Sequence, residues 1–371
     1  MTPEENDRLT RVGPGTPCGD MLRRYWWPVW FCEELRGMPV PVRLLGEDLV
    51  LFRQSGGEPG LLDRRCPHRG ASLELGRVEA DGLRCCYHGW KFAADGSCLD
   101  MPAEPPGTPL INEVRQRAHV VREAAGLVFA YIGPDPVPEF PRYDLLLQTG
   151  LERHLHATLD HCNWLQRAEN GVDQLHAGIL HAAGYPELAL KQAMDIKWTR
   201  EWYGVRASYS VAGGQGKVSH CLFPANNRYF GARVGDRPSQ NMHFRVPVDD
   251  FQTMTFGIRA HESDDGADHV ITGGLRVKER GVYDRVEDGW WGLASRDQDR
   301  AAQESQGIVA DRSRETLGTS DRGIVLFRRM VREAIDAVER GEDPPGVIRD
   351  PGHDVITFDA SQMRDGRLME A

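Results

Sequence analysis

Two short stretches of the sequence each place a cysteine just before a histidine. Cys66 and His68 form C-x-H, Cys85 and His88 form C-x-x-H, and residues 69–84 separate the two pairs. Two thiolates and two imidazoles can hold one tetrahedral zinc ion, or a two-iron cluster in which histidines replace cysteines on one iron. The spacing favours the cluster, because each loop can give its sulfur to one iron and its nitrogen to the other.

The residues around these pairs fit a redox role. Neutral imidazole in place of thiolate removes negative charge and raises the reduction potential, which suits an electron relay. Gly70 and Gly89 would allow the backbone to approach the cluster closely. Cys86 also precedes a histidine, but Cys85 keeps the C-x-x-H spacing, so we interpret Cys86 as a packed free thiol outside the ligand set.

These stretches together resemble a known family. "CPHRGASLELG" and "CCYHGWKF" are similar to the Rieske [2Fe–2S] domain of the ring-hydroxylating oxygenases. The resemblance implies that Cys66, His68, Cys85 and His88 hold a Rieske cluster in a small antiparallel β domain.

A second motif, D-x-x-H-x-x-x-x-H, comprises Asp173, His176 and His181. On an ideal helix Asp173 and His176 share a face and His181 points away from it, although Gly178 could relax the helix enough for both imidazoles to converge. Two histidines and a distant carboxylate form the facial triad of non-haem Fe(II) oxygenases. Taken alone, a histidine pair of this kind is more often a surface or core feature than a ligand pair.

The segment around this motif resembles the iron-binding helix of Rieske oxygenases. By that resemblance, His176 and His181 bind a mononuclear iron, and Asp173 bridges His176 to His88 of a neighbouring subunit. The segment from Ser295 resembles phthalate-dioxygenase-like oxygenases, in which an Asp five residues before a Glu-Ser pair completes the iron site. That position is Asp299, with Asp297 as the alternative. Without the resemblance, the sequence around both is typical of a solvated charged turn.

The resemblance also implies an activity. A separate NAD(P)H-dependent flavin and iron–sulfur reductase would feed the cluster, and the mononuclear Fe(II) would activate O2 to hydroxylate an aromatic or related organic substrate. The implied assembly is a homotrimer in which electrons cross a subunit boundary. Dihydroxylation, monohydroxylation and O- or N-demethylation use the same iron site and stay open.

Two arginines are candidate substrate contacts. Arg206 and Arg245 lie on alternating, strand-like segments, and a buried arginine can hold a carboxylate through two hydrogen bonds. Salt bridges explain them equally well. A non-catalytic electron carrier and a structural zinc protein remain the other classes of function to test.

Composition narrows the classes of partner that the protein could bind. The net charge is −10, and no Lys/Arg block would track nucleic-acid phosphates. The sequence contains neither an N-terminal apolar segment nor a membrane-length apolar run, so we expect a cytoplasmic protein. Its eight cysteines then indicate metal ligation or free thiols rather than a disulfide framework.

The elements that must position these residues fall into three segments. Residues 1–38 are expected to be a helical N-terminal segment, residues 39–140 the antiparallel β Rieske domain, and residues 141–371 a catalytic domain whose antiparallel sheet packs on long helices. The fold class is therefore α+β. A hairpin is expected at Gly46–Asp48. A final helix is expected from Asp321 to Glu339, with Ser320 as N-cap and with a buried stripe. That stripe consists of Ile324, Phe327, Val331, Ile335 and Val338.

Overall fold

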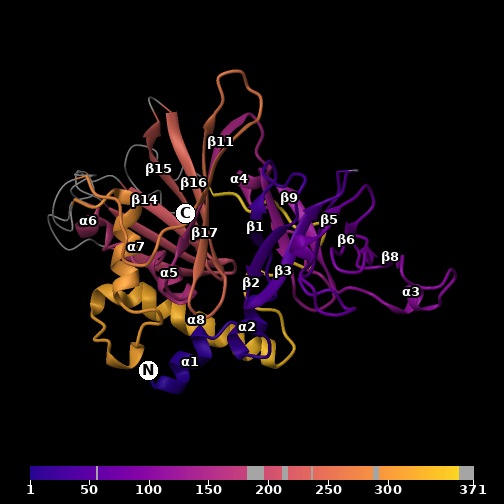
Figure 1. Ribbon diagram of the computed structural model, residues 1–371. Helices are drawn as coiled ribbons and strands as arrows, with labels where there is room; N and C mark the ends of the chain where they lie inside the picture. Colours follow the sequence, from indigo (N-terminus) through magenta and orange to yellow (C-terminus); the bar gives the residue numbers. More distant parts are fainter. Residues whose placement is uncertain (56, 182–195, 211–215, 235–236, 287–291, 359–371) are drawn as a thin grey trace.

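The computed structural model describes residues 1–55, 57–181, 196–210, 216–234, 237–286 and 292–358. Within these ranges the strands form two smaller sheets in residues 27–131 and one eight-stranded sheet in residues 151–276. Figure 1 shows the smaller sheets on the right, the large sheet at the centre and helices on its left side. The α+β architecture expected from the sequence is confirmed.

The six-stranded sheet is built from hairpins with left-handed turns. Leu45 and Gly46 have φ values of 50° and 79°, and Ala125 and Gly126 have 50° and 84°. Two-residue loops with positive φ at both positions match the right-handed twist of paired strands. The expected hairpin is therefore confirmed, with its turn at Leu45–Gly46. The strand order is β1 (Trp27–Phe31), β10 (Leu127–Tyr131), β9 (Ala118–Ala124), β4 (Pro59–Asp63), β3 (Glu47–Arg53), β2 (Val40–Leu44).

The four-stranded sheet carries the second cysteine loop. Between β6 and β7 the chain makes the turn that contains Cys85 and His88. A small apolar core, separate from the main one, surrounds Cys66 and Cys85 and includes Phe52, Leu83 and Phe92. The strands are β5 (Arg77–Val78), β6 (Leu83–Arg84), β7 (Lys91–Phe92) and β8 (Cys98–Asp100), and the short helix α3 (Leu110–Glu113) follows.

The eight-stranded sheet separates the two halves of the molecule. All its neighbouring strands are antiparallel except β11 and β18, which are parallel, so the sheet is mixed rather than purely antiparallel. One face packs on the six-stranded sheet through aromatic pairs such as Phe129 and Phe244, whose ring centroids are 5.4 Å apart. The strand order is β12 (Ile196–Glu201), β13 (Gly204–Ser210), β14 (Gly216–Leu222), β15 (Asn226–Val234), β16 (Arg237–Pro247), β17 (Thr253–Glu262), β11 (Leu151–Asp160), β18 (His269–Arg276).

Helices cover the other face of this sheet (Figure 1). The bounds of the helices that follow α3 are α4 (Asp144–Leu147), α5 (Trp164–Asn170), α6 (Ala177–Leu180), α7 (Ser295–Ser305) and α8 (Arg322–Glu339). The N-cap of α8 is Asp321, so the expectation for Ser320 is wrong by one residue. Phe327, Val331, Ile335 and Val338 are buried as expected, and Ile324 is half-buried against the same core.

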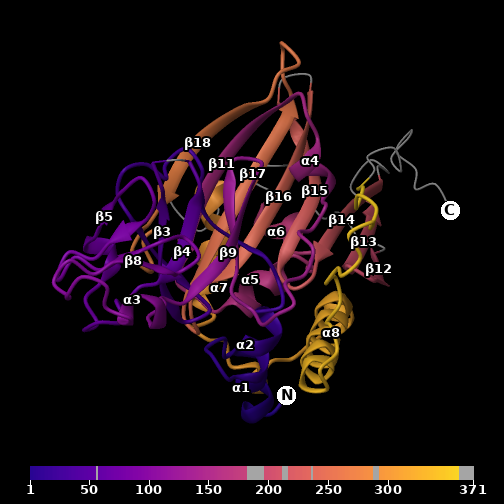
Figure 2. The ribbon, with the colours of Figure 1, turned by 90° about the vertical axis from the view of Figure 1, so that its right-hand side faces the viewer.

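The N-terminal helices pack near the last helix (Figure 2). These are α1 (Pro3–Thr10), which Thr2 caps, and α2 (Pro17–Leu22). Arg8 Nη2 lies 2.7 Å from Asp336 Oδ1 and 2.8 Å from Glu339 Oε2. The segment expected to be helical up to residue 38 is helical only to Leu22, because β1 belongs to the six-stranded sheet.

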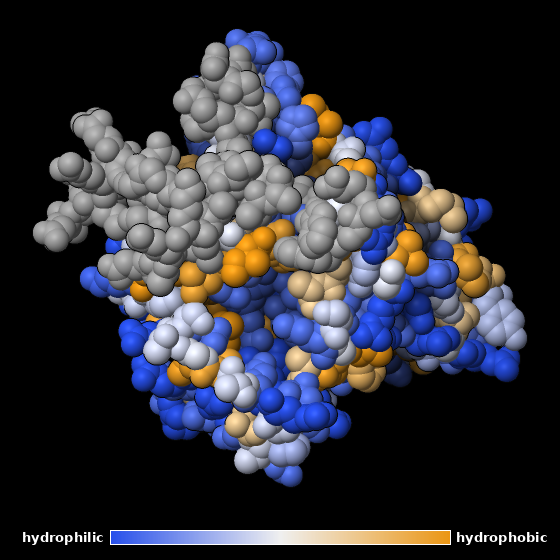
Figure 3. Space-filling view, turned by 90° about the vertical axis from the view of Figure 1, so that its left-hand side faces the viewer, coloured by the Kyte–Doolittle hydropathy of each residue, from blue (hydrophilic) through white to orange (hydrophobic). Residues whose placement is uncertain are grey.

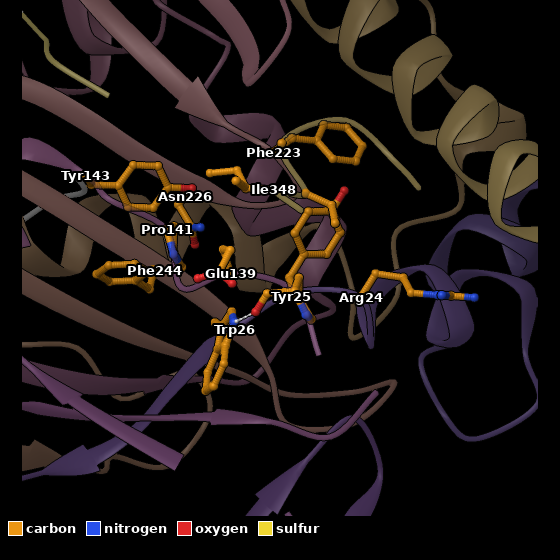
Figure 4. Close-up of a pocket in the computed structure, with 13 residues that line it drawn as sticks. Arg24, Tyr25, Trp26, Glu139, Pro141, Tyr143, Phe223, Asn226, Phe244 and Ile348 are labelled. Atoms are coloured by element: carbon orange, nitrogen blue, oxygen red, sulfur yellow. Dashed lines mark hydrogen bonds between the residues drawn. The ribbon is translucent and has the colours of Figure 1, made fainter. Parts of the chain in front are cut away.

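Three distant segments meet where the two halves join. Residues 24–26, 138–143 and 346–348 surround a small pocket, and Trp26 Nε1 donates to Pro138 O at 3.1 Å (Figure 4). Its volume of about 20 Å³ suits roughly one water molecule and no organic substrate. Across the described ranges, no helix is both long and apolar enough to cross a membrane.

Candidate metal centres

The two cysteine–histidine loops have the same backbone design. Gly70 N donates to Cys66 O at 2.9 Å, and Gly89 N donates to Cys85 O at 3.2 Å. Each glycine has positive φ, 74° and 76°, which a residue with a Cβ rarely adopts. The positive φ closes the turn that follows each cysteine–histidine pair, and the two pairs face the same space.

The four side chains lie together without a disulfide between the cysteines. Cys66 and Cys85 are buried, unbridged and adjacent, and burial, together with the Cys85 thiol, raises the pKa of Cys66 to about 11. The rings of His68 and His88 are 4.5 Å apart, and the buried Nδ1 of His68 has no hydrogen-bond partner. Two adjacent buried thiols, two neighbouring imidazoles and one orphaned imidazole nitrogen fit a shared metal group.

The structure places the histidines nearer the surface than the sulfurs. His68 and His88 are half-buried, and the Trp90 ring stacks on His68 at 4.4 Å. Cys86 is exposed, so the expectation that its thiol is packed is wrong. Its position at the surface explains why it takes no part in the buried donor set.

The second motif does not form one continuous helix. Helix α5 ends at Asn170, and the single-turn helix α6 begins just after His176 and ends just before His181. The two histidines therefore flank one turn, which brings their ring centroids to 5.4 Å. The helix breaks at residues 171–176, so Asp173 lies outside both helices and the two histidines cap the ends of α6.

The carboxylate of Asp299 on α7 meets both rings. Its Oδ1 lies 3.4 Å from His176 Nε2 and 3.3 Å from His181 Nε2, and one donor atom of each residue lies within 4.8 Å of the others. Burial opposes ionisation, but His181, His176 and Arg167 hold the pKa of Asp299 far below its usual range. This donor set of two imidazoles and one ionised carboxylate fits a divalent iron.

Asp297 has a different environment. It is fully buried, and its two oxygens accept from Arg276 at 2.8 and 2.6 Å while Arg300 approaches at 3.3 Å. Two residues apart on a helix, Asp297 and Asp299 point in nearly opposite directions. The structure therefore brings Asp299, and not Asp297, to the histidines.

Two neighbouring residues orient the histidine rings. His176 Nδ1 contacts the carbonyl oxygen of Asp173, whereas the Asp173 carboxylate accepts from the backbone N–H of residue 176 and its Oδ2 is 4.0 Å from Nδ1. His181 Nδ1 lies 2.8 Å from Gln298 Oε1. These contacts at Nδ1 leave each Nε2 free to face Asp299.

Sequence reasoning missed two amide side chains. Gln298 orients His181, and Asn170 Nδ2 lies 3.2 Å from His176 Nε2 and 3.3 Å from Asp299 Oδ1. The weak signal for both was their position, since Gln298 adjoins Asp299 and Asn170 ends the helix that leads to His176.

The large sheet supplies a polar floor beside this triad. Gly257 on β17 is the register partner of both His156 on β11 and His243 on β16. The ring centroids of the two histidines are 6.0 Å apart. His156 is exposed, yet burial and Arg245 lower its pKa. A side chain that is accessible to solvent but surrounded by protein atoms, as His156 is, typically lies in a recess. Figure 3 shows polar residues around a hollow on this side of the molecule.

The two candidate arginines lie on opposite faces of the sheet. Arg245 alternates with core residues on β16 and is 5% exposed; its buried Nε has no hydrogen-bond partner, and burial, reinforced by Arg167, lowers its pKa to about 10. Arg206 is the register partner of His220, which pairs with Arg228, which in turn pairs with Met242. Arg206 therefore shares a face of the sheet with Met242, whereas the neighbouring residue His243 lies on the opposite face. Arg206 therefore does not face the triad, contrary to expectation.

Comparison with known proteins decides the family. Residues 25–128 match the model of the Rieske [2Fe-2S] domain, and residues 288–366 match that of the LigXa C-terminal domain like family. The 5,5'-dehydrodivanillate O-demethylase oxygenase subunit of Sphingobium sp. (strain NBRC 103272 / SYK-6) is 36% identical over 95% of this chain and 84% of its own. The chain belongs to the Rieske oxygenases.

Other relatives of this Rieske oxygenase carry out different reactions. The phthalate 4,5-dioxygenase oxygenase subunit of Pseudomonas putida is 32% identical over 93% of this chain and 89% of its own. The solved structure of Pseudomonas putida CBB5 NdmA QL mutant with theobromine has the same fold, with a TM-score of 0.69, 22% identity and coverage of 90% of this chain and 98% of that one. The cofactors of this oxygenase are thus a Rieske [2Fe–2S] cluster and a mononuclear iron, not a structural zinc.

Proposed function

We propose that this Rieske oxygenase hydroxylates an aromatic or related organic substrate. Cys66, His68, Cys85 and His88 would hold the cluster, and His176, His181 and Asp299 would hold the mononuclear Fe(II). The observation that carries the proposal is the convergence of these last three residues within 4.8 Å, which an electron carrier does not need. When bound, the two iron groups supply electron transfer and the activation of O2.

The residues of the chain fix the geometry of the iron site. Contacts to Asp173 O and Gln298 Oε1 would fix the tautomers of the two histidines, so that both Nε2 atoms carry lone pairs. Three protein donors on one side leave other positions open for O2. Asn170, within hydrogen-bonding distance of Asp299, would limit the movement of that carboxylate.

Arg245 supports an aromatic acid as substrate. Among the described residues its guanidinium forms no hydrogen bond or ion pair, and a buried unpaired arginine favours an anionic partner. His156 and His243 flank it as neutral rings, because burial lowers the pKa of both. An oxygenated ring with one carboxylate fits this floor.

Demethylation is the second candidate reaction. It would use the same residues, and the matched relatives include both an O-demethylase and a dioxygenase. Substrate methoxy or N-methyl groups positioned at the iron would be oxidised instead of the ring.

We further propose a homotrimer fed by a separate NAD(P)H-dependent reductase. Asp173 is partly exposed, and the backbone hydrogen bonds that its carboxylate accepts are both on Oδ1, which leaves Oδ2 free to accept from His88 of another subunit. That contact would join the two metal sites across the boundary. We also propose the domain limits 39–140 and 141–371.

Iron counting tests the assignment of the two sites. Anaerobically purified wild type should hold about three irons per chain and give a Rieske EPR signal after dithionite reduction. His176→Ala should keep that signal and lose about one iron. Two irons in both proteins would make the chain an electron carrier and overturn the proposal.

A further inference from the structure

A second group of two histidines and one carboxylate lies on β11 and β17. Glu152 and His154 belong to β11, and His261 on β17 is the register partner of Glu152. Residues two apart on a strand, and register partners on neighbouring strands, point to the same face of a sheet. One donor atom from each of the three lies within 4.8 Å of the other two. The donor types are those of the proposed mononuclear iron site.

The ring of His261 has the orientation of a metal ligand. Its Nδ1 lies 3.1 Å from the carbonyl oxygen of Glu262, so Nδ1–H donates there and Nε2 carries the lone pair. Nε2 then faces Glu152 Oε1 at 3.6 Å, which is too long for a hydrogen bond. Two electron-rich atoms facing each other in this way are stabilised by a cation between them.

The group is accessible on one side only. The side chain of His261 is 10% exposed, whereas those of Glu152 and His154 are 31% and 44% exposed. His154 Nε2 is 2.8 Å from Glu152 Oε1, so both histidines converge on one carboxylate oxygen. Three protein donors on the sheet side and water on the open side match the coordination that zinc accepts.

The geometry points to a second metal site, in which Glu152, His154 and His261 bind a divalent transition-metal ion such as Zn²⁺. Imidazole and carboxylate donors suit this class of ion better than Mg²⁺ or Ca²⁺, which prefer oxygen ligands throughout. The ion would cross-link β11 to β17 beyond His156, at the end of β11 opposite Asp160. Binding to the folded state alone would stabilise the sheet.

Equilibrium dialysis tests this site. Untagged, iron-loaded protein is dialysed against micromolar Zn²⁺ and then against buffer, and zinc and iron per chain are counted by mass spectrometry. Wild type should retain about one zinc with its iron unchanged, and His261→Ala and Glu152→Ala should bind zinc at least about tenfold more weakly. An unchanged Rieske EPR signal shows that each variant is folded.

Two controls identify where the zinc binds. His269 is on the neighbouring strand β18, and its Nε2 is held by Asp265 at 2.9 Å, so His269→Ala should keep the zinc. His176→Ala should lose iron and keep the zinc. Zinc lost in His176→Ala but kept in His261→Ala would mean binding at the iron site. Equal loss in His269→Ala, or no zinc in wild type, would equally overturn the assignment.

Discussion

At the scale of single residues, packing decides which of two similar side chains enters the site. Asp297 and Asp299 are two residues apart, and the sequence alone favours Asp299 only through a family resemblance. In the structure Arg276 and Arg300 already satisfy Asp297, whereas Asp299 faces only partners that stabilise its negative charge. The family resemblance supplied both candidates, but the choice depends on arginines far along the chain or one turn away.

The two aspartates should therefore respond differently to substitution. Asp299→Ala should lose the mononuclear iron and keep the Rieske signal. Asp297→Asn should keep both metals but lose roughly 3–5 kcal/mol of stability, because it leaves a buried arginine poorly paired. Iron analysis and thermal unfolding distinguish these outcomes. Loss of iron in Asp297→Asn at full stability would contradict the assignment.

Gln298 should act through His181. Gln298→Leu removes the acceptor at Nδ1, and we expect mononuclear iron affinity to fall about 10–100-fold. Gln298→Glu keeps an acceptor and should restore most of the affinity. Iron titration of metal-free protein measures both. Equal affinity in the leucine variant and wild type would show that the contact does not orient the ring.

At the scale of elements, the break between α5 and α6 was the part of the site that periodicity could not show. On an ideal helix, Asp173, His176 and His181 would belong to one continuous element. The chain instead leaves the helix at Gly171, where the Asn227 side chain from β15 packs directly against it. A contact from another strand, absent from any local pattern, thus sets the position of His176.

Gly171→Ala tests this contact. An added Cβ would lie 2.1 Å from Asn227 Nδ2, so the buried Asn227 side chain must move or displace α5, and we expect the histidines to move apart. We expect weaker iron binding and lower turnover with an intact Rieske signal. Gly13→Ala, where a Cβ would meet no atom within 4 Å, is the matched control and should behave as wild type.

At the scale of the whole molecule, the large sheet has the proposed iron site on one face and the cluster-bearing half on the other. Sequence reasoning predicted this two-part organisation well, because the strand pattern of residues 39–131 and the cluster motif are local. It could not place β1 in the first sheet or pair β18 in parallel with β11, since both pairings join residues distant along the chain.

Electron transfer between subunits can be tested by mixed assembly. His176→Ala lacks the mononuclear iron, and Cys85→Ala lacks the cluster, so each homo-oligomer should be inactive. Co-expressed as one assembly, the two should recover substrate oxidation, because an intact cluster then faces an intact iron across the boundary. If the mixed assembly contains both chains by mass spectrometry but does not oxidise the substrate, electron transfer occurs within one chain.

The ion pair between Arg8 and Asp336 has a consequence for biosynthesis. The two residues are 328 positions apart. At roughly 5–20 residues per second, a ribosome needs roughly 16–66 s to travel between them. During that interval α2, whose Met21 and Leu22 are buried in the finished protein, has no α8 to pack against. The nascent chain therefore carries apolar surface that a chaperone can bind until α8 has been synthesised.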